Sequence, residues 1–171
     1  MEKIAWLVLT VVTLIAAIAA QRRPRALTIG RVALGIYYVF AGALVHVVYL
    51  ARGETYASFA DAAHFSFVRD TWRALVAPHH LFFIGLLVIF EATMGVLVLS
   101  GGRRAEVGMI GILGMQAGLL LFGWVITLGA VLMLIAVGLL LRSQRRYDQK
   151  VVQSAPEPAA PAASNASGRS S

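Results

Sequence analysis

Long apolar runs interrupted by short basic stretches form the main pattern of the chain. Residues 4–20, 32–51 and 81–100 contain almost no charged side chain. About twenty apolar residues in a helix, at roughly 1.5 Å rise per residue, cover the hydrocarbon core of a bilayer, which is about 30 Å thick. Each of these three runs therefore predicts a helix that spans a membrane.

The fourth apolar stretch, residues 107–141, is too long for a single span. One helix of that length would extend about 52 Å, well beyond the thickness of the hydrocarbon core. We expect two helices joined by a tight turn at Phe122-Gly123-Trp124, because glycine can reverse the chain and tryptophan favours the membrane interface. The pattern thus predicts an all-α integral membrane bundle with five transmembrane helices.

The first apolar run resembles both a signal peptide and a membrane anchor. Lys3 precedes it, and Ala17-Ile18-Ala19 has the small-x-small form of a cleavage site. The basic stretch at residues 21–25 follows at once, however, and such a stretch resists translocation across the membrane. We therefore expect residues 1–25 to form a retained transmembrane anchor followed by a basic cytoplasmic turn.

Composition and charge agree with a single membrane domain. The chain has 171 residues, of which 59% are hydrophobic and 13% charged, whereas soluble domains contain about 25% charged residues. Ten basic residues fall on one side of the predicted spans, and the positive-inside rule places that side in the cytoplasm. They are Arg22, Arg23, Arg25, Arg31, Arg103, Arg104, Arg142, Arg145, Arg146 and Lys150. We expect a multi-pass protein of the inner (plasma) membrane, with its N-terminus outside and its C-terminus inside.

Two further consequences follow from the composition. The basic residues are explained by topology, so they do not indicate nucleic-acid binding. The chain has no cysteine, which excludes disulfides, thiolate metal sites and dithiol redox chemistry.

Two segments lie outside the predicted spans. In residues 54–77 the apolar side chains Phe65, Val68 and Trp72 recur at three- and four-residue spacing between charged residues, and Pro78 follows. This spacing predicts an amphipathic helix on the outer membrane surface, either as a cap over the bundle or as a lid that gates a substrate. Residues 151–171 are rich in Pro, Ala and Ser, which predicts a disordered cytoplasmic tail.

Glu91 is the most unusual residue of the predicted membrane spans, because it is the only charged group in residues 81–100. A charged side chain at that depth costs roughly 2.5–3.5 kcal/mol on insertion scales, so it should face the protein interior. His46 and Gln116 lie at similar depth in the outer half of their spans, and Tyr38 shares a helix face with His46. The predicted buried polar site consists of Glu91, His46, Gln116 and Tyr38.

The site has two interpretations. Its groups either fix helix packing through hydrogen bonds, or bind a proton, a cofactor or a substrate. Counting residues from the outer ends of the spans places His46 and Glu91 about 7 Å apart in depth. Direct contact between them therefore requires helix tilt, a bridging water or Tyr38 as the actual partner. Close helix packing is expected at glycines: Gly108, Gly111, Gly114 and Gly118 form a ridge of small residues.

With these residues identified, the region 31–141 resembles the DoxX-like family of small bacterial membrane proteins. The resemblance rests on Arg31-Val32-Ala33-Leu34-Gly35, Phe40-Ala41-Gly42 with His46, Tyr56-x-x-Phe59-Ala60, and Phe90-Glu91-Ala92-Thr93-Met94-Gly95 followed by the basic turn Arg103-Arg104. The resemblance covers about two thirds of the chain. It implies a DoxX-like four-helix core, here residues 26–150, preceded by one extra N-terminal transmembrane helix.

The resemblance also suggests a function. Some members are subunits of thiosulfate:quinone oxidoreductases or quinol oxidases, whereas the related disulfide-forming quinone reductases need cysteines that this chain lacks. No nucleophile–base pair, Cys/His metal spacing or Gly-rich phosphate loop is present in the sequence, so we expect neither catalytic residues nor a metal site. The leading hypothesis is an accessory subunit of a redox-linked membrane assembly. Its partners would be the lipid bilayer and a membrane redox protein or a second copy of the chain, and quinone is the one cofactor considered. The alternatives are a small proton-linked transporter with Glu91 as proton carrier, and a structural membrane protein without activity.

Overall fold

The computed structural model describes residues 2–153, and this part of the chain is helical with one isolated β-bridge. The all-α prediction is confirmed. The segments η1 and η2 are π-helical, with the i→i+5 hydrogen bonds of that wider helix. The elements are α1 (Glu2–Ala20), α2 (Pro24–Ile36), η1 (Tyr37–Leu44), α3 (Val45–Ala51), α4 (Ser58–Asp61), α5 (Ser66–Thr71), η2 (Trp72–Val76), α6 (His80–Ser100), α7 (Gly102–Leu119) and α8 (Trp124–Gln153).

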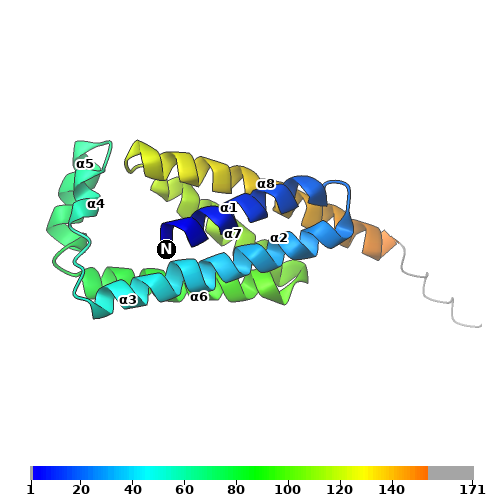
Figure 1. The fold of residues 1–171 in the computed structure, drawn as a ribbon, viewed down its shortest axis with the longest axis horizontal. Coiled ribbons are helices and arrows are strands. Elements are labelled where there is room, and N and C mark those ends of the chain that lie inside the picture. Colours follow the sequence, from blue (N-terminus) through cyan, green and yellow to red (C-terminus); the bar gives the residue numbers. More distant parts are fainter. Residues whose placement is uncertain (1, 154–171) are drawn as a thin grey trace, which may run out of the picture.

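The long helices lie side by side in one bundle (Figure 1). The elements α2, η1 and α3 form one continuous rod, which packs against α6, and α7 packs against both α6 and α8. The first helix, α1, packs against α2 and α8 and so closes the ring. The α1–α2 turn, the α6–α7 turn and the end of α8 gather at one end of the bundle (Figure 1). We call it the arginine-rich end, because the predicted cytoplasmic arginines lie in the α1–α2 turn and in the parts of α2, α7 and α8 near this end.

Three helices within the described residues are long and apolar enough to cross a membrane: Pro24–Ala51, His80–Ser100 and Trp124–Gln149. The first helix contributes a shorter apolar stretch, Val8–Ala20, and α7 carries two arginines and a glutamate in its first turns. Of the five predicted spans, length and composition thus support three. Large apolar side chains remain exposed around the bundle, as a lipid-facing surface requires; Ile15, Phe82 and Ile89 are 62%, 67% and 65% exposed.

The predicted turn between the last two helices is present, whereas the second predicted span begins earlier than expected. Helix α7 ends at Leu119 and α8 begins at Trp124, which confirms the turn predicted at residues 122–124. The second span begins at Pro24 and not at residue 32, because the helix continues through Arg31. The Arg31 guanidinium donates to the carbonyls of Val98 (3.3 Å) and Leu99 (3.4 Å) near the C-terminus of α6, where a positive charge complements the helix dipole.

The helix predicted within residues 54–77 is confirmed for residues 66–76, but its extension back to residue 54 as one helix is wrong. The segment forms two short helical pieces, α4 and the continuous α5–η2, separated at residues 62–65. The break has a physical cause: the His64 amide donates to the Leu121 carbonyl at 3.0 Å, and Ala63 pairs with Phe122 in a β-bridge. These bonds tie the chain to the α7–α8 turn, so it cannot continue as a helix there.

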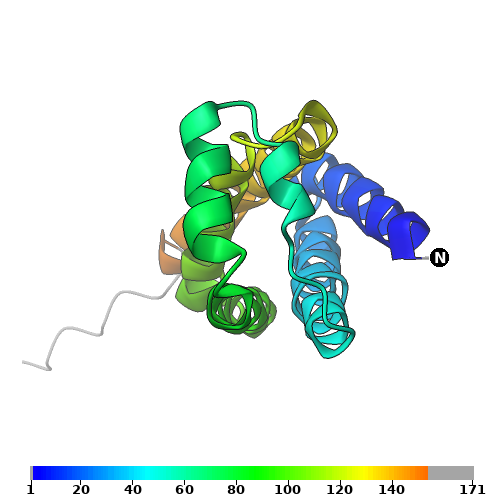
Figure 2. The same ribbon diagram turned by 90° about the vertical axis from the view of Figure 1, so that its left-hand side faces the viewer.

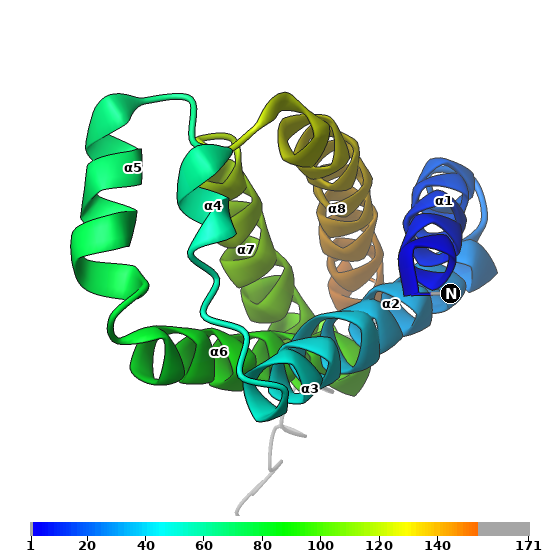
Figure 3. The ribbon, with the colours of Figure 1, turned by 60° about the vertical axis from the view of Figure 1, so that its left-hand side comes forward.

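Residues 54–79, which we call the cap, close the end of the bundle opposite the arginine-rich end (Figures 2 and 3). The rings of Phe59 and Trp72 stack at 5.8 Å, and both meet Phe122 edge-on, at 6.1 Å and 5.2 Å. Aromatic contacts of this kind contribute roughly 0.5–1.5 kcal/mol each beyond their buried area. The cap is therefore packed onto the α7–α8 turn.

Two further predictions need correction or fall beyond the described residues. The small-residue ridge of α7 is limited to Gly108 and Gly111. An added Cβ would lie 2.9 Å from the Met94 carbonyl oxygen at Gly108 and would overlap the Met94 sulfur at Gly111. Gly114 and Gly118 face open space. Helix α8 extends to Gln153, three residues into the predicted tail (151–171), and residues 154–171 lie outside the described residues.

Candidate functional site

Glu91 points from the middle of α6 into the bundle, and its residue is only 5% exposed. Its carboxyl lies against η1 at Gly42, where an added Cβ would be 3.0 Å from the Glu91 Cδ and Oε2 atoms. A side chain at residue 42 would therefore displace the carboxyl. Gly42 belongs to the site because the space that it leaves empty holds the acid.

His46, in α3, approaches the same carboxyl from the cap end. Its Nε2 lies 3.7 Å from Glu91 Oε2. This distance allows electrostatic attraction but exceeds that of a hydrogen bond. Residue counting predicted an offset of about 7 Å in depth, whereas the antiparallel packing of η1–α3 against α6 brings the two side chains together without Tyr38 between them.

Tyr56, the first buried residue of the cap, holds the histidine in place. Its hydroxyl lies 2.8 Å from His46 Nδ1, and its carbonyl accepts a hydrogen bond of 2.8 Å from Trp72 Nε1. Burial raises the pKa of Tyr56 to about 12, so its hydroxyl stays protonated at neutral pH. If this hydroxyl donates to Nδ1 of a neutral imidazole, the Nε2–H group of His46 faces Glu91.

The backbone of Tyr56 is strained. Its φ angle is 58°, the only positive φ of a non-glycine residue in the described chain. A bulky residue in this conformation costs on the order of 1–3 kcal/mol, and such strain is found preferentially at functional sites. The contacts with His46 and Trp72 hold it there. The strained backbone and the contact of the hydroxyl with His46 thus occur at the same residue.

One oxygen of the site has no hydrogen-bond donor. Within residues 2–153, Glu91 Oε2 is buried and makes no hydrogen bond. A buried polar atom left without a partner costs about 1–3 kcal/mol and is rare in native structures. This oxygen can therefore accept a hydrogen bond from the hydroxyl of a ligand, or it can take up a proton itself.

The other two predicted residues form a separate pair. Gln116 Nε2 donates to the Tyr38 hydroxyl at 2.6 Å, and both residues are buried, at 3% and 0% exposure. The four predicted residues therefore form two pairs. Glu91 with His46 has an oxygen without a hydrogen bond, whereas Tyr38 and Gln116 bond to each other and so link η1 to α7.

Tyr56 and Gly42 were not predicted as site residues, although each of them stands in a recognisable sequence pattern. Tyr56 stood in the family-like pattern Tyr56-x-x-Phe59, and Gly42 lies between Tyr38 and His46 at four-residue spacing. Neither signal shows by itself that a cap tyrosine reaches back to a histidine within a span.

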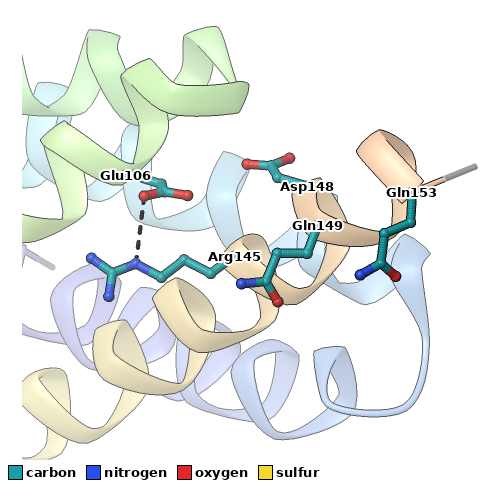
Figure 4. Close-up of a pocket in the computed structure, with 5 residues that line it drawn as sticks. All are labelled: Glu106, Arg145, Asp148, Gln149 and Gln153. Carbon is teal, nitrogen blue, oxygen red and sulfur yellow. Dashed lines mark ion pairs between the residues drawn. The ribbon is translucent and has the colours of Figure 1, made fainter. Parts of the chain in front are cut away.

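The other titratable clusters in the described residues are of a different kind. No group of three His, Cys, Asp or Glu side chains that could hold a metal is present there. A cavity of about 520 Å³ lies at the arginine-rich end, lined by α7 and α8. Figure 4 shows Arg145 reaching from α8 to Glu106 of α7, 3.5 Å away, with Asp148 and Gln149 further along α8. This open, charged cavity is at the opposite end of the bundle from the cap.

A functional proposal for this chain must be built on the geometry of Glu91, His46 and Tyr56. Comparison of the chain with protein families, with characterised proteins and with solved structures gives no match.

Proposed function

We propose that the protein is an accessory membrane subunit of a redox-linked, quinone-associated assembly, and that Glu91 and His46 exchange protons there. In this proposal residues 26–150 form a DoxX-like four-helix core, and α1 is the additional helix. The observation that carries the proposal is the buried Oε2 of Glu91, which lacks a donor and lies 3.7 Å from His46.

The acceptor oxygen of Glu91 and the imidazole of His46 match the hydroxyl groups of a reduced quinone in chemical type. A bound quinol would supply two hydroxyl hydrogens and two electrons. The Glu91 oxygen can accept a hydrogen bond or a proton from a hydroxyl, and the imidazole of His46 can relay that proton. Tyr56 keeps the imidazole oriented through the 2.8 Å contact with Nδ1. The chain has no cysteine to carry electrons, so the proposal assigns the electron acceptor to a partner protein.

The proposed orientation follows from charge. Arg22 and Arg23 lie in the α1–α2 turn, and Arg103 and Arg104 lie in the first turn of α7. The positive-inside rule favours the cytoplasm for these four residues. The cap and the N-terminus would then lie outside. Protons that leave Glu91 through His46 and Tyr56 would be released on that outer side.

Quinone binding to the full-length protein in lipid nanodiscs tests the proposal. In a variant that keeps Trp72 as its one tryptophan (Trp6→Phe with Trp124→Phe), the fluorescence of Trp72, whose indole bonds to Tyr56, should be quenched saturably by a short-chain quinone. Glu91→Gln should weaken binding of the reduced form about ten-fold or more, because a hydrogen bond to a charged group contributes roughly 1.5–3 kcal/mol. Glu106→Gln, which removes a carboxyl at the other end of the bundle, should bind like the wild type. Equal binding by the two variants would refute the assignment.

The subunit role has its own test. Affinity purification of the full chain from its native membrane in a mild detergent should bring a redox protein with it. A chain that runs as a lone monomer, with no protein copurifying, would contradict membership of an assembly while leaving the quinone result untouched.

A small proton-linked transporter is the second candidate, favoured by the route from Glu91 through His46 to Tyr56 at the cap. Proteoliposome flux with an imposed pH gradient distinguishes the two functions. A carrier would show solute-coupled proton movement that Glu91→Gln abolishes, whereas a quinone-associated subunit would show none. A structural protein would show neither activity, and Glu91→Gln combined with His46→Ala would leave its phenotype unchanged.

A further inference from the structure

A small basic cavity lies at the arginine-rich end, between the α1–α2 turn and α8. Its volume is about 150 Å³, and its lining includes Gln21, Arg22, Arg23, Ser143, Arg146 and Tyr147. The volume is about five times the roughly 30 Å³ that one water molecule occupies in the liquid. The cavity is thus large enough for a tetrahedral phosphate group.

The floor of the cavity is held together by hydrogen bonds. Gln21 Nε2 donates to the Leu139 carbonyl at 2.9 Å and lies 2.7 Å from Ser143 Oγ. Ser143 is 6% exposed, and Leu27, which also lines the cavity, is 5% exposed. These bonds join the end of α1 to α8, so the three arginines are carried on a fixed frame.

The positive charge of this cavity is not neutralised within the described residues. Within the part of the chain that the structure describes, the ion pairs are His46–Glu91, Arg73–Asp61 and Arg145–Glu106. None of them includes a cavity arginine, that is Arg22, Arg23 or Arg146. Asp148, the acidic residue nearest to Arg146 in sequence, accepts hydrogen bonds from Gln144 at 3.1 Å. Three guanidinium groups around one small cavity are suited to bind a phosphate.

The start of α2 adds to this attraction. Helix α2 has 13 residues, no acidic residue in its first turn and no side-chain cap at Arg23. Pro24 has no N–H and the Ala26 N–H donates to the Arg23 carbonyl, so what the start of α2 offers to an anion next to Pro24, which also lines the cavity, is the positive end of the helix dipole.

The position of the cavity indicates the source of the phosphate. It lies where α1 and α2 leave the apolar part of the bundle, and Ile18 and Ile29, close by in sequence, are 58% and 57% exposed. Basic pockets between helices at this depth are typical binding sites for anionic lipid head groups. We propose that this cavity binds the phosphate of an anionic phospholipid, whose acyl chains lie along the apolar surface of α1 and α2.

Native mass spectrometry of the full-length protein, released from detergent with phosphatidylglycerol or phosphatidylcholine, tests this site. The wild type should retain phosphatidylglycerol selectively. Each basic group near a membrane surface contributes about five-fold in affinity. Replacing Arg22, Arg23 and Arg146 together by Gln should thus reduce retention on the order of 100-fold. The single variant Arg146→Gln should lose about five-fold and serves if the triple variant does not fold.

The control is Arg103→Gln with Arg104→Gln, which removes two charges from the same end of the bundle but not from the cavity. It should keep the selectivity of the wild type. Equal retention of both lipids by the wild type, or an equal loss in the control and the triple variant, would overturn the proposal. Displacement of the lipid by millimolar inorganic phosphate would also overturn it, because the cavity would then be a site for free phosphate.

Discussion

Replacing Gly95 by alanine should destabilise the bundle at the contact that supports the candidate site. Gly95 lies one turn after Glu91 in α6, where the helix backbone meets that of α2. A Cβ at residue 95 would lie 2.7 Å from Val39 Cγ2 and 3.0 Å from the Gly35 carbonyl oxygen. Carbon atoms in contact prefer about 3.5–4.0 Å. The valine methyl can move, but the carbonyl belongs to a helix backbone, so the two helices must separate.

The size of the effect follows from two opposing terms. Overpacking of a close contact costs about 1–3 kcal/mol, and alanine gains about 0.8–1.0 kcal/mol over glycine in a helix. Gly85→Ala is the matched control, because it lies in the same helix and an added Cβ there meets nothing within 4 Å. The helix-propensity gain is common to both variants, so the difference between them, about 1–3 kcal/mol, measures the overpacking alone.

Reversible unfolding in mixed micelles, followed by far-ultraviolet circular dichroism, measures this difference. Gly95→Ala should be less stable than Gly85→Ala by that amount. It should also weaken the binding of any ligand that contacts Glu91 and His46, because the helices that carry these residues would lie further apart. If the two variants are equally stable, the close approach of α2 and α6 is not a feature of the protein, and the site geometry that depends on it fails as well.

Three further outcomes can be measured on the same protein. Gln116→Leu should lower the unfolding free energy by about 1–3 kcal/mol, because it leaves the buried Tyr38 hydroxyl unpaired. Adding Tyr38→Phe should recover most of this loss. Strictly additive effects of the two substitutions would contradict the 2.6 Å hydrogen bond between the two residues. Tyr56→Phe should cost about 0.5–1.5 kcal/mol through the lost contact with His46, and an unchanged stability would show that the hydroxyl contributes nothing. Trp72→Ala should speed amide exchange in the cap without unfolding the bundle, whereas Phe67→Ala, at a residue 64% exposed, should not; equal exchange in both would refute the packing of the cap on Phe122.

The membrane helices could be predicted from the sequence because their signal is local. Length and apolar composition alone indicate a span, and a stretch too long for one span requires a turn, which the structure places between Leu119 and Trp124. The start of the second span was missed because Arg31 in a helix suggests a boundary. Only the fold shows that its guanidinium reaches the carbonyls of Val98 and Leu99.

The cap and the pairing within the site depend on contacts distant in sequence. The spacing of apolar residues in 54–77 predicts a helix, but the bond between the His64 amide and the Leu121 carbonyl overrides it. The cost of a buried charge predicted that Glu91 needs partners without identifying the nearest one. Tyr56 could not be found from periodicity, because it reaches His46 from a strained backbone outside any helix.

Infrared difference spectroscopy of the full-length protein in lipid nanodiscs, recorded on addition of a reduced quinone analogue, tests the role of Glu91 most directly. Glu91 is 5% exposed and its Oε2 lacks a donor in the described structure, so a ligand hydroxyl that reaches it must change its carboxyl vibration. A carboxyl band should change on addition, disappear in Glu91→Gln and persist in Glu106→Gln. A spectrum without such a band, or the same band in Glu91→Gln, would contradict this role of Glu91.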